Sequence, residues 1–278
     1  MIAKGTKGAE VITLQLKLNE SGAKLKADGD FGAATEAALK AYQTANLNTK
    51  ITGVLDAETL ACMYPLVLPC AKYVPMKRGQ YHHGVSDKRG ICLHHTAGGP
   101  KAETVGIMWE NDDRGRVATH LVVGADGTII QTMPLQCWGN HIAMFRVGMK
   151  NDTKINSQYI GIEICNWGYL DLKEGIFINY VNRVVPANEA VQLDKPFMGK
   201  KYWHKYTDAQ IKSVRLILAE LKEIYGFKYE NLPLDASWFD IDTKAQNGIR
   251  VLATHTNFEG NKKADCSPQP AFFEMIKP

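Results

Sequence analysis

The feature that most constrains the fold is a series of short apolar runs that begins near residue 89. Runs of four to eight apolar residues bounded by turn signals are typical of buried strands. Asp126-Gly127 divides one run into two halves, which predicts a hairpin at that point. The runs are ICLHH (91–95), HLVVGADGTIIQ (120–131), YIGIEICN (159–166) and RVLATH (250–255).

Helical patterns alternate with these runs. Thr207 and Gln210 have the spacing of a capping box, and apolar residues then recur on one helical face until Gly226, so we expect a long amphipathic helix there. A short helix is expected over AFFEMIK (271–277). Strands mixed with helices predict an α/β domain, with a mixed central sheet flanked by helices. Residues 169–206 show no period, and we interpret them as a long irregular loop bordering a cleft.

The first part of the chain has a different pattern. Residues 8–47 contain two helical patterns separated by a turn, and a third, shorter one begins at Asp56. We expect a small three-helix domain over residues 1–66, a linker over 67–88 and the α/β domain over 89–278. Two domains agree with the length of 278 residues, which exceeds the usual single-domain size of about 100–200.

Composition limits the possible partners. The 33 Lys and Arg against 29 Asp and Glu give a net charge of +4 without a long basic run, which disfavours nucleic acid and leaves an anionic polymer possible. No run of 18 apolar residues and no export signal is found, so we expect no stable membrane insertion and synthesis in the cytoplasm. The six cysteines lack a CxxC pair and fit reduced thiols. We expect a monomer.

Two strand-end histidines are candidates for chemistry. His94 and His255 each end an apolar run, and a carboxylate and a thiol, Asp265 and Cys266, follow the second. Such a set can form a three-ligand zinc site with an open position. Because no HExxH-type motif supports it, spacing alone leaves a structural role for each histidine equally open. Glu163 interrupts an apolar run, where a carboxylate is costly unless it is used, paired or turned outward.

The chain resembles a known family over most of residues 89–275. LHHTAGG, ATHLVVGADGTIIQ, YIGIEICN, YTDAQIKSVRLILAEL and THTNFEGNKKADCSPQPAF occur in the order seen in N-acetylmuramoyl-L-alanine amidases, the superfamily that includes phage lysozyme-type amidases and peptidoglycan recognition proteins. Over about residues 5–65, LQLKLNESG, ADGDFGAATEAALKAYQ and ITGVLDAETL resemble the peptidoglycan-binding domain found beside many wall hydrolases. The resemblance implies Zn²⁺ as cofactor and peptidoglycan as partner.

The resemblance also implies metal ligands. The first histidine of the strand-end motif binds zinc in this family, which implies His94, and the second maps to His255. Family members carry one Asp or one Cys as third ligand, whereas this chain has both in succession. We expect Cys266, because zinc binds thiolate strongly, and keep Asp265 as the alternative.

Catalytic and substrate-binding residues are implied in the same way. Glu163 matches the catalytic glutamate of related bacterial amidases; members that lack it use a tyrosine where this chain has Thr119. Lys263 matches the lysine that stabilises the oxyanion in members with an Asp ligand, and this match weakens if Cys266 is the ligand. His120, Trp138 and His141 are expected to line the substrate groove, with burial in the core as the alternative for His120 and Trp138.

The function implied is hydrolysis of the amide bond between N-acetylmuramic acid and the L-alanine of the stem peptide. A wall-binding domain beside such an enzyme, with no export signal, resembles a phage endolysin that acts after a separate protein permeabilises the membrane. Two alternatives are kept: a recognition module that has lost catalysis, and a zinc peptidase that cuts within the stem peptide.

Overall fold

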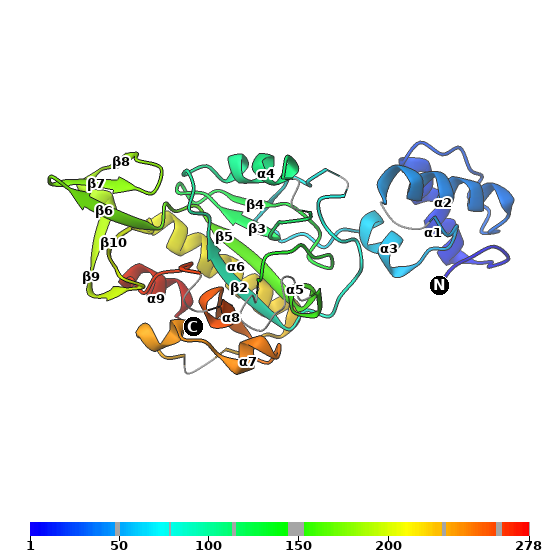
Figure 1. The fold of residues 1–278 in the computed structure, drawn as a ribbon. Helices are drawn as coiled ribbons and strands as arrows, with labels where there is room; N and C mark the ends of the chain where they lie inside the picture. The colour runs from blue at the N-terminus through cyan, green and yellow to red at the C-terminus, as the bar shows by residue number, and fades with distance from the viewer. Residues whose placement is uncertain are drawn as a thin grey trace.

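The computed structural model describes residues 1–47, 51–77, 79–112, 115–143, 153–229, 232–259 and 263–277. The chain begins with α1 (Ala9–Glu20), α2 (Ala33–Asn46) and α3 (Ala57–Met63), which form the small unit at the right of Figure 1. Asp56 caps α3 by accepting a hydrogen bond from the Thr59 amide at 2.8 Å. The expected three-helix domain is confirmed. Its core contains Val11, Leu14, Leu18, Phe31, Leu39 and Met63.

The larger domain is built on a six-stranded sheet with the order β1-β4-β3-β5-β2-β11. Only the β3–β4 pair is antiparallel, so the sheet is mixed. Its strands are β1 (Lys72–Tyr73), β2 (Gly90–His95), β3 (Leu121–Val123), β4 (Ile129–Gln131), β5 (Tyr159–Ile164) and β11 (Leu252–Thr254). The hairpin expected at Asp126-Gly127 joins β3 to β4.

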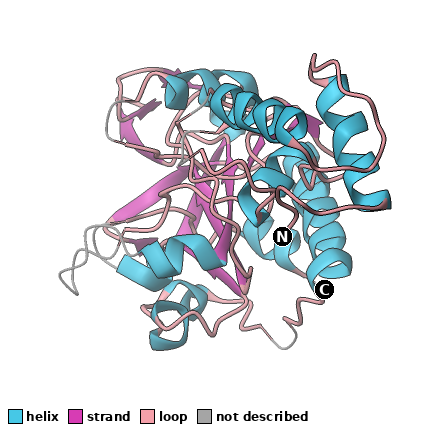
Figure 2. Cartoon of the chain, turned by 90° about the vertical axis from the view of Figure 1, so that its right-hand side faces the viewer, coloured by secondary structure: helices cyan, strands magenta, loops and turns pink. Residues whose placement is uncertain are grey.

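Helices cover both faces of this sheet, and Figure 2 shows the strands in the interior with helices around them. One face packs against α6 (Asp208–Tyr225) and α9 (Pro270–Ile276), with Leu93 and Ile162 among the strand residues in that core. The other face packs against α4 (Ala102–Glu110). The expected fold class is therefore confirmed. Shorter helices are α5 (Thr153–Gln158), α7 (Thr243–Gln246), α8 (Thr256–Glu259), η2 (Ala187–Glu189) and η3 (Ala236–Phe239).

The two ends of α6 agree with the prediction from the sequence. Thr207 and Gln210 form both hydrogen bonds of the capping box, and Gly226 ends the helix with φ 65°. A left-handed residue at this position suits glycine, which has no Cβ to clash. The helix expected near the C-terminus is also present, as α9.

Residues 169–206 are not the irregular loop that the sequence suggested. They form a second sheet, wholly antiparallel, with the order β8-β7-β6-β10-β9 (left in Figure 1). Two of its hairpins turn through two residues with positive φ, Glu174-Gly175 and Met198-Gly199. Turns of this kind match the twist of paired strands. The strands are β6 (Tyr169–Lys173), β7 (Ile176–Asn179), β8 (Val184–Val185), β9 (Ala190–Phe197) and β10 (Lys200–His204).

Residues 67–88, expected as a linker, pack onto the larger domain. Leu68 is buried in the core beneath α6, and Met76 and Tyr81 are buried with α4. The same segment contains β1, which pairs with β4 of the sheet. The boundary between functional domains stays a prediction.

All six cysteines lie in the described part of the chain and are free thiols, as expected. Among the described helices, none has the length and apolar character needed to cross a membrane.

Candidate metal centre and active site

Three side chains meet at the carboxyl ends of β2 and β11. The Nδ1 atoms of His94 and His255 lie 3.1 Å apart, and Oδ2 of Asp265 lies 3.0 Å from the first and 3.2 Å from the second. The possible ligand atoms of these residues all lie within 4.8 Å of one another. Two imidazoles and one carboxylate are a donor set that zinc uses in catalytic sites with an open fourth position.

The register of the sheet explains this meeting. β5, β2 and β11 are neighbouring parallel strands, in which His94 pairs with Glu163 and Leu93 pairs with Thr254. His255 follows Thr254 directly, so it comes beside His94 at the same edge. Residues far apart in the sequence are brought together because parallel strands end on the same side.

Burial and charge set the protonation of the three residues. Burial lowers the pKa of His94 to about 4, with Asp265 opposing part of the shift. For Asp265, burial would raise the pKa, but the two histidines beside it hold the value well below the usual range. The site therefore presents a charged carboxylate and a neutral His94 imidazole near neutral pH, and these are the forms that bind a metal.

Cys266 lies elsewhere. Its side chain is fully buried in the core between the sheet, α6 and α9, where its thiol hydrogen-bonds to the Tyr206 hydroxyl. Burial raises its pKa well above the ordinary value for a thiol. The structure therefore brings Asp265, the alternative third ligand, to the two histidines, and it does not bring Cys266.

Glu163 stands beside His94 on β5. Its Oε2 atom is buried and has no hydrogen-bond partner within the described residues. Burial raises the pKa of this carboxyl well above its ordinary value, the charge of Asp265 raises it further, and Lys263 opposes the shift. The positive charge of Lys263 is thus close enough to act on Glu163. A buried carboxyl with a free oxygen next to candidate metal ligands is suited to proton transfer.

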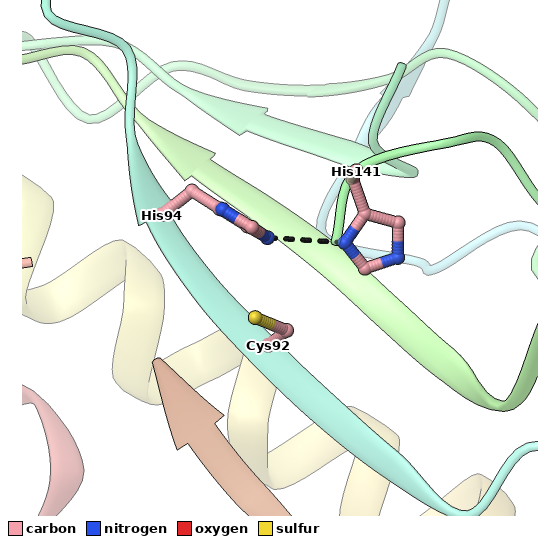
Figure 3. Close-up of side chains that lie close together, drawn as sticks. All are labelled: Cys92, His94 and His141. Atoms are coloured by element: carbon pink, nitrogen blue, oxygen red, sulfur yellow. Dashed lines mark hydrogen bonds between the residues drawn. The ribbon is translucent and has the colours of Figure 1, made fainter. Parts of the chain in front are cut away.

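His141 is placed against the metal group. Its Nδ1 atom lies 3.0 Å from Nε2 of His94, and its Nε2 atom lies 3.2 Å from the carbonyl oxygen of Tyr159. Cys92, two residues before His94, lies on the same face of β2, so that Cys92, His94 and His141 form a second group (Figure 3). The contact between His94 and His141 could not be predicted from the sequence, because 46 residues separate them and no local motif links them.

The other two residues expected to bind substrate have different surroundings. Nε2 of His120 donates to the Cys137 carbonyl at 2.8 Å, and Nδ1 accepts from the Gly161 amide at 3.1 Å, so this buried ring is fully hydrogen-bonded within the core. Trp138 stacks on His82 with ring centroids 3.7 Å apart. Its backbone also pairs with His82, so its contacts within the described chain are with the segment before β2.

Comparison with known families agrees with this architecture. Residues 85–267 match the family model described as N-acetylmuramoyl-L-alanine amidase, and residues 7–63 match that of a peptidoglycan binding domain. The molecule is thus a modular peptidoglycan hydrolase with a wall-binding domain before its catalytic domain. The chain belongs to the N-acetylmuramoyl-L-alanine amidase family, whose reaction is cleavage of the amide bond between N-acetylmuramic acid and the L-alanine of the stem peptide.

Several solved structures are similar to parts of this chain. An endolysin N-acetylmuramoyl-L-alanine amidase from Clostridium intestinale is 15% identical, with 75% of this chain and 94% of that chain covered and a TM-score of 0.39. The AmpD derivative is 17% identical, with 76% and 97% covered and a TM-score of 0.41. A Burkholderia AP3 phage endolysin is 30% identical over 26% of this chain and 27% of its own, with a TM-score of 0.22. No curated protein matches the chain. At these TM-scores the family models alone carry the assignment.

Proposed function

We propose that the amidase is zinc-dependent and that His94, His255 and Asp265 hold the ion. The observation that carries this proposal is the convergence of two imidazole nitrogens and one carboxylate oxygen, each within about one hydrogen-bond length of the others. A bound zinc ion would lower the pKa of a water molecule and polarise the scissile carbonyl. Asp265 takes the place that the sequence had suggested for Cys266, whose thiol is occupied by Tyr206.

Glu163 is the proposed general base and acid. Its Oε2 is buried and has no hydrogen-bond partner in the part of the chain that the structure describes, and the residue stands on the strand next to His94. There it would accept the proton of the attacking water and later return it to the leaving amine of L-alanine. Burial raises the pKa of this carboxyl, which would help it to hold the proton that it takes from the water until the amine leaves.

Lys263 is the proposed cationic group for the tetrahedral intermediate. The positive charge of Lys263 is one of the influences that lower the pKa of His94 and of Glu163. Its field would therefore also act on the substrate carbonyl, which would develop negative charge between these residues. A fixed positive charge at an oxyanion stabilises the transition state more than the ground state.

The cellular role that we propose is host lysis by a phage endolysin. A peptidoglycan-binding domain beside an amidase domain supports this role, because the first would keep the second on the polymer that it cuts. We propose that the enzyme is made in the cytoplasm, acts as a monomer, and reaches the wall after a separate protein permeabilises the membrane.

The products of wall digestion test the proposed reaction. Purified peptidoglycan treated with the full chain should release free amino termini of L-alanine, and a zinc chelator should abolish the release until zinc is restored. New reducing sugar ends would indicate a glycosidase, and new amino termini within the stem peptide would indicate a peptidase. Either result would contradict the proposal.

A further inference from the structure

A chain of hydrogen bonds leads from the backbone to the candidate metal site. It begins at the carbonyl oxygen of Tyr159, passes through Nε2 and Nδ1 of His141, and reaches Nε2 of His94. The opposite nitrogen of His94, Nδ1, faces Asp265 and His255. His141 and His94 come from separate segments of the chain, and Figure 3 shows the dashed contact between them.

The direction of these hydrogen bonds follows from one atom. A carbonyl oxygen can only accept, so Nε2 of His141 must carry the ring proton that points at Tyr159. A neutral imidazole has one such proton, so Nδ1 of His141 is left as an acceptor. Nε2 of His94 must then donate to it, and Nδ1 of His94 keeps its lone pair on the side of Asp265.

We propose that His141 is a positioning residue that fixes His94 in the tautomer needed to bind the metal through Nδ1. The inference rests on the proposed zinc site. A histidine ligand commonly donates its second N–H to an outer partner, which sets its tautomer and its orientation. Here that partner is a second histidine, whose own tautomer is fixed by a backbone carbonyl.

The structure keeps space for this contact at Gly161 on β5. A Cβ atom added there would lie 2.9 Å from Nδ1 of His141 and 2.7 Å from the methyl group of Thr119. Any larger residue would press on the nitrogen that accepts from His94. Glycine at this position therefore lets the ring of His141 approach β5 closely, within reach of His94.

His255 provides an internal comparison. The amide of Ala143 donates to its Nε2 at 3.2 Å, so the ring proton of His255 lies on Nδ1, on the side of the metal site. Binding a metal through this nitrogen would move the ring proton to Nε2, and this would end the hydrogen bond from Ala143. Zinc should therefore change the tautomer of His255, whereas His94 and His141 already have the form that they keep in the loaded site.

Zinc affinity tests the proposal by substitution. In competition with a chromophoric chelator, His141→Leu should weaken zinc binding about 10–100-fold, the usual cost of losing an outer partner. His141→Asn, whose side-chain oxygen can accept from His94, should keep most of the affinity. His82→Leu is the matched control, because His82 stacks on Trp138 away from the site, and its zinc affinity should be unchanged.

The outcomes separate the two claims. If the wild-type chain binds zinc and His141→Leu binds it equally well, the role of His141 is refuted while the proposed function stands. If the wild-type chain binds no zinc, the proposed function fails.

Nitrogen-15 NMR of the histidine side chains in the metal-free, full-length wild type needs no variant. It should show protons on Nε2 of His94 and His141 and on Nδ1 of His255. A proton on Nδ1 of His94 would overturn the inference, even if the leucine variant did not fold.

Discussion

Replacing Asp265 and Cys266 one at a time distinguishes a metal ligand from a core residue. Asp265→Asn keeps the size of the side chain but removes the charged oxygen that lies 3.0 Å from His94 and 3.2 Å from His255. Loss of an outer partner alone costs about 10–100-fold in metal affinity. Loss of a direct ligand should therefore weaken zinc binding by more than about 100-fold.

Cys266→Ala should affect stability instead. The substitution removes a fully buried sulfur atom and its hydrogen bond with Tyr206. A small core cavity and one lost buried hydrogen bond together destabilise by about 1–3 kcal/mol. Zinc affinity should stay at the wild-type value, because the thiol faces the core under α6 and α9 rather than the histidines.

Two measurements on each variant are sufficient. The dissociation constant for zinc is obtained by chelator competition, and the free energy of unfolding is obtained by urea denaturation of the metal-free chain. The reasoning would be refuted if Cys266→Ala lost zinc while Asp265→Asn retained it.

Two further predictions concern protons. Glu163→Gln should lower the rate of amide cleavage by about 10²–10⁴ while zinc content and wall binding stay unchanged, which amino-terminus release, metal analysis and a pelleting assay would check; a rate near wild type would exclude Glu163 as the base. Lys88 is buried, its acceptors among the described residues are the carbonyls of Cys137 and Ser157, and burial lowers its pKa from 10.5 to about 7. The unfolded chain then holds more protons between these two pH values, so the free energy of unfolding should rise with pH across this window, by about 3 kcal/mol more in wild type than in Lys88→Met. The free energies of unfolding are obtained by urea denaturation at pH 7 and at pH 10. If they change equally with pH in the wild type and in Lys88→Met, Lys88 does not titrate in this way.

Strong local signals allowed much of the fold to be predicted. The capping box at Thr207 and Gly226 bounded α6, and Asp126-Gly127 marked the β3–β4 hairpin. The second sheet was missed because its turns, Glu174-Gly175 and Met198-Gly199, carry a weaker signal than Asp-Gly or Asn-Gly. Much of this sheet is also exposed, so its strands lack the continuous apolar runs that marked the buried strands of the first sheet.

The site residues on strands could be predicted from the sequence, whereas those outside strands were harder to predict. His94, Glu163 and His255 end or interrupt apolar runs, and the parallel register of β5, β2 and β11 then brings them together. The choice between Asp265 and Cys266 depends on which of two adjacent side chains turns toward the histidines, and composition does not determine this. The contact of His141 with His94 depends on the path of a segment between strands, which no periodic pattern records.

X-ray absorption at the zinc edge of the loaded, full-length enzyme tests the central claim most directly. Zinc lies about 2.0–2.2 Å from nitrogen and oxygen ligands and about 2.3 Å from sulfur. Ligation by His94, His255 and Asp265 predicts a first shell of nitrogen and oxygen alone, with the multiple-scattering pattern of two imidazoles. A sulfur scatterer at the longer distance would contradict the account, because it would make a cysteine a ligand.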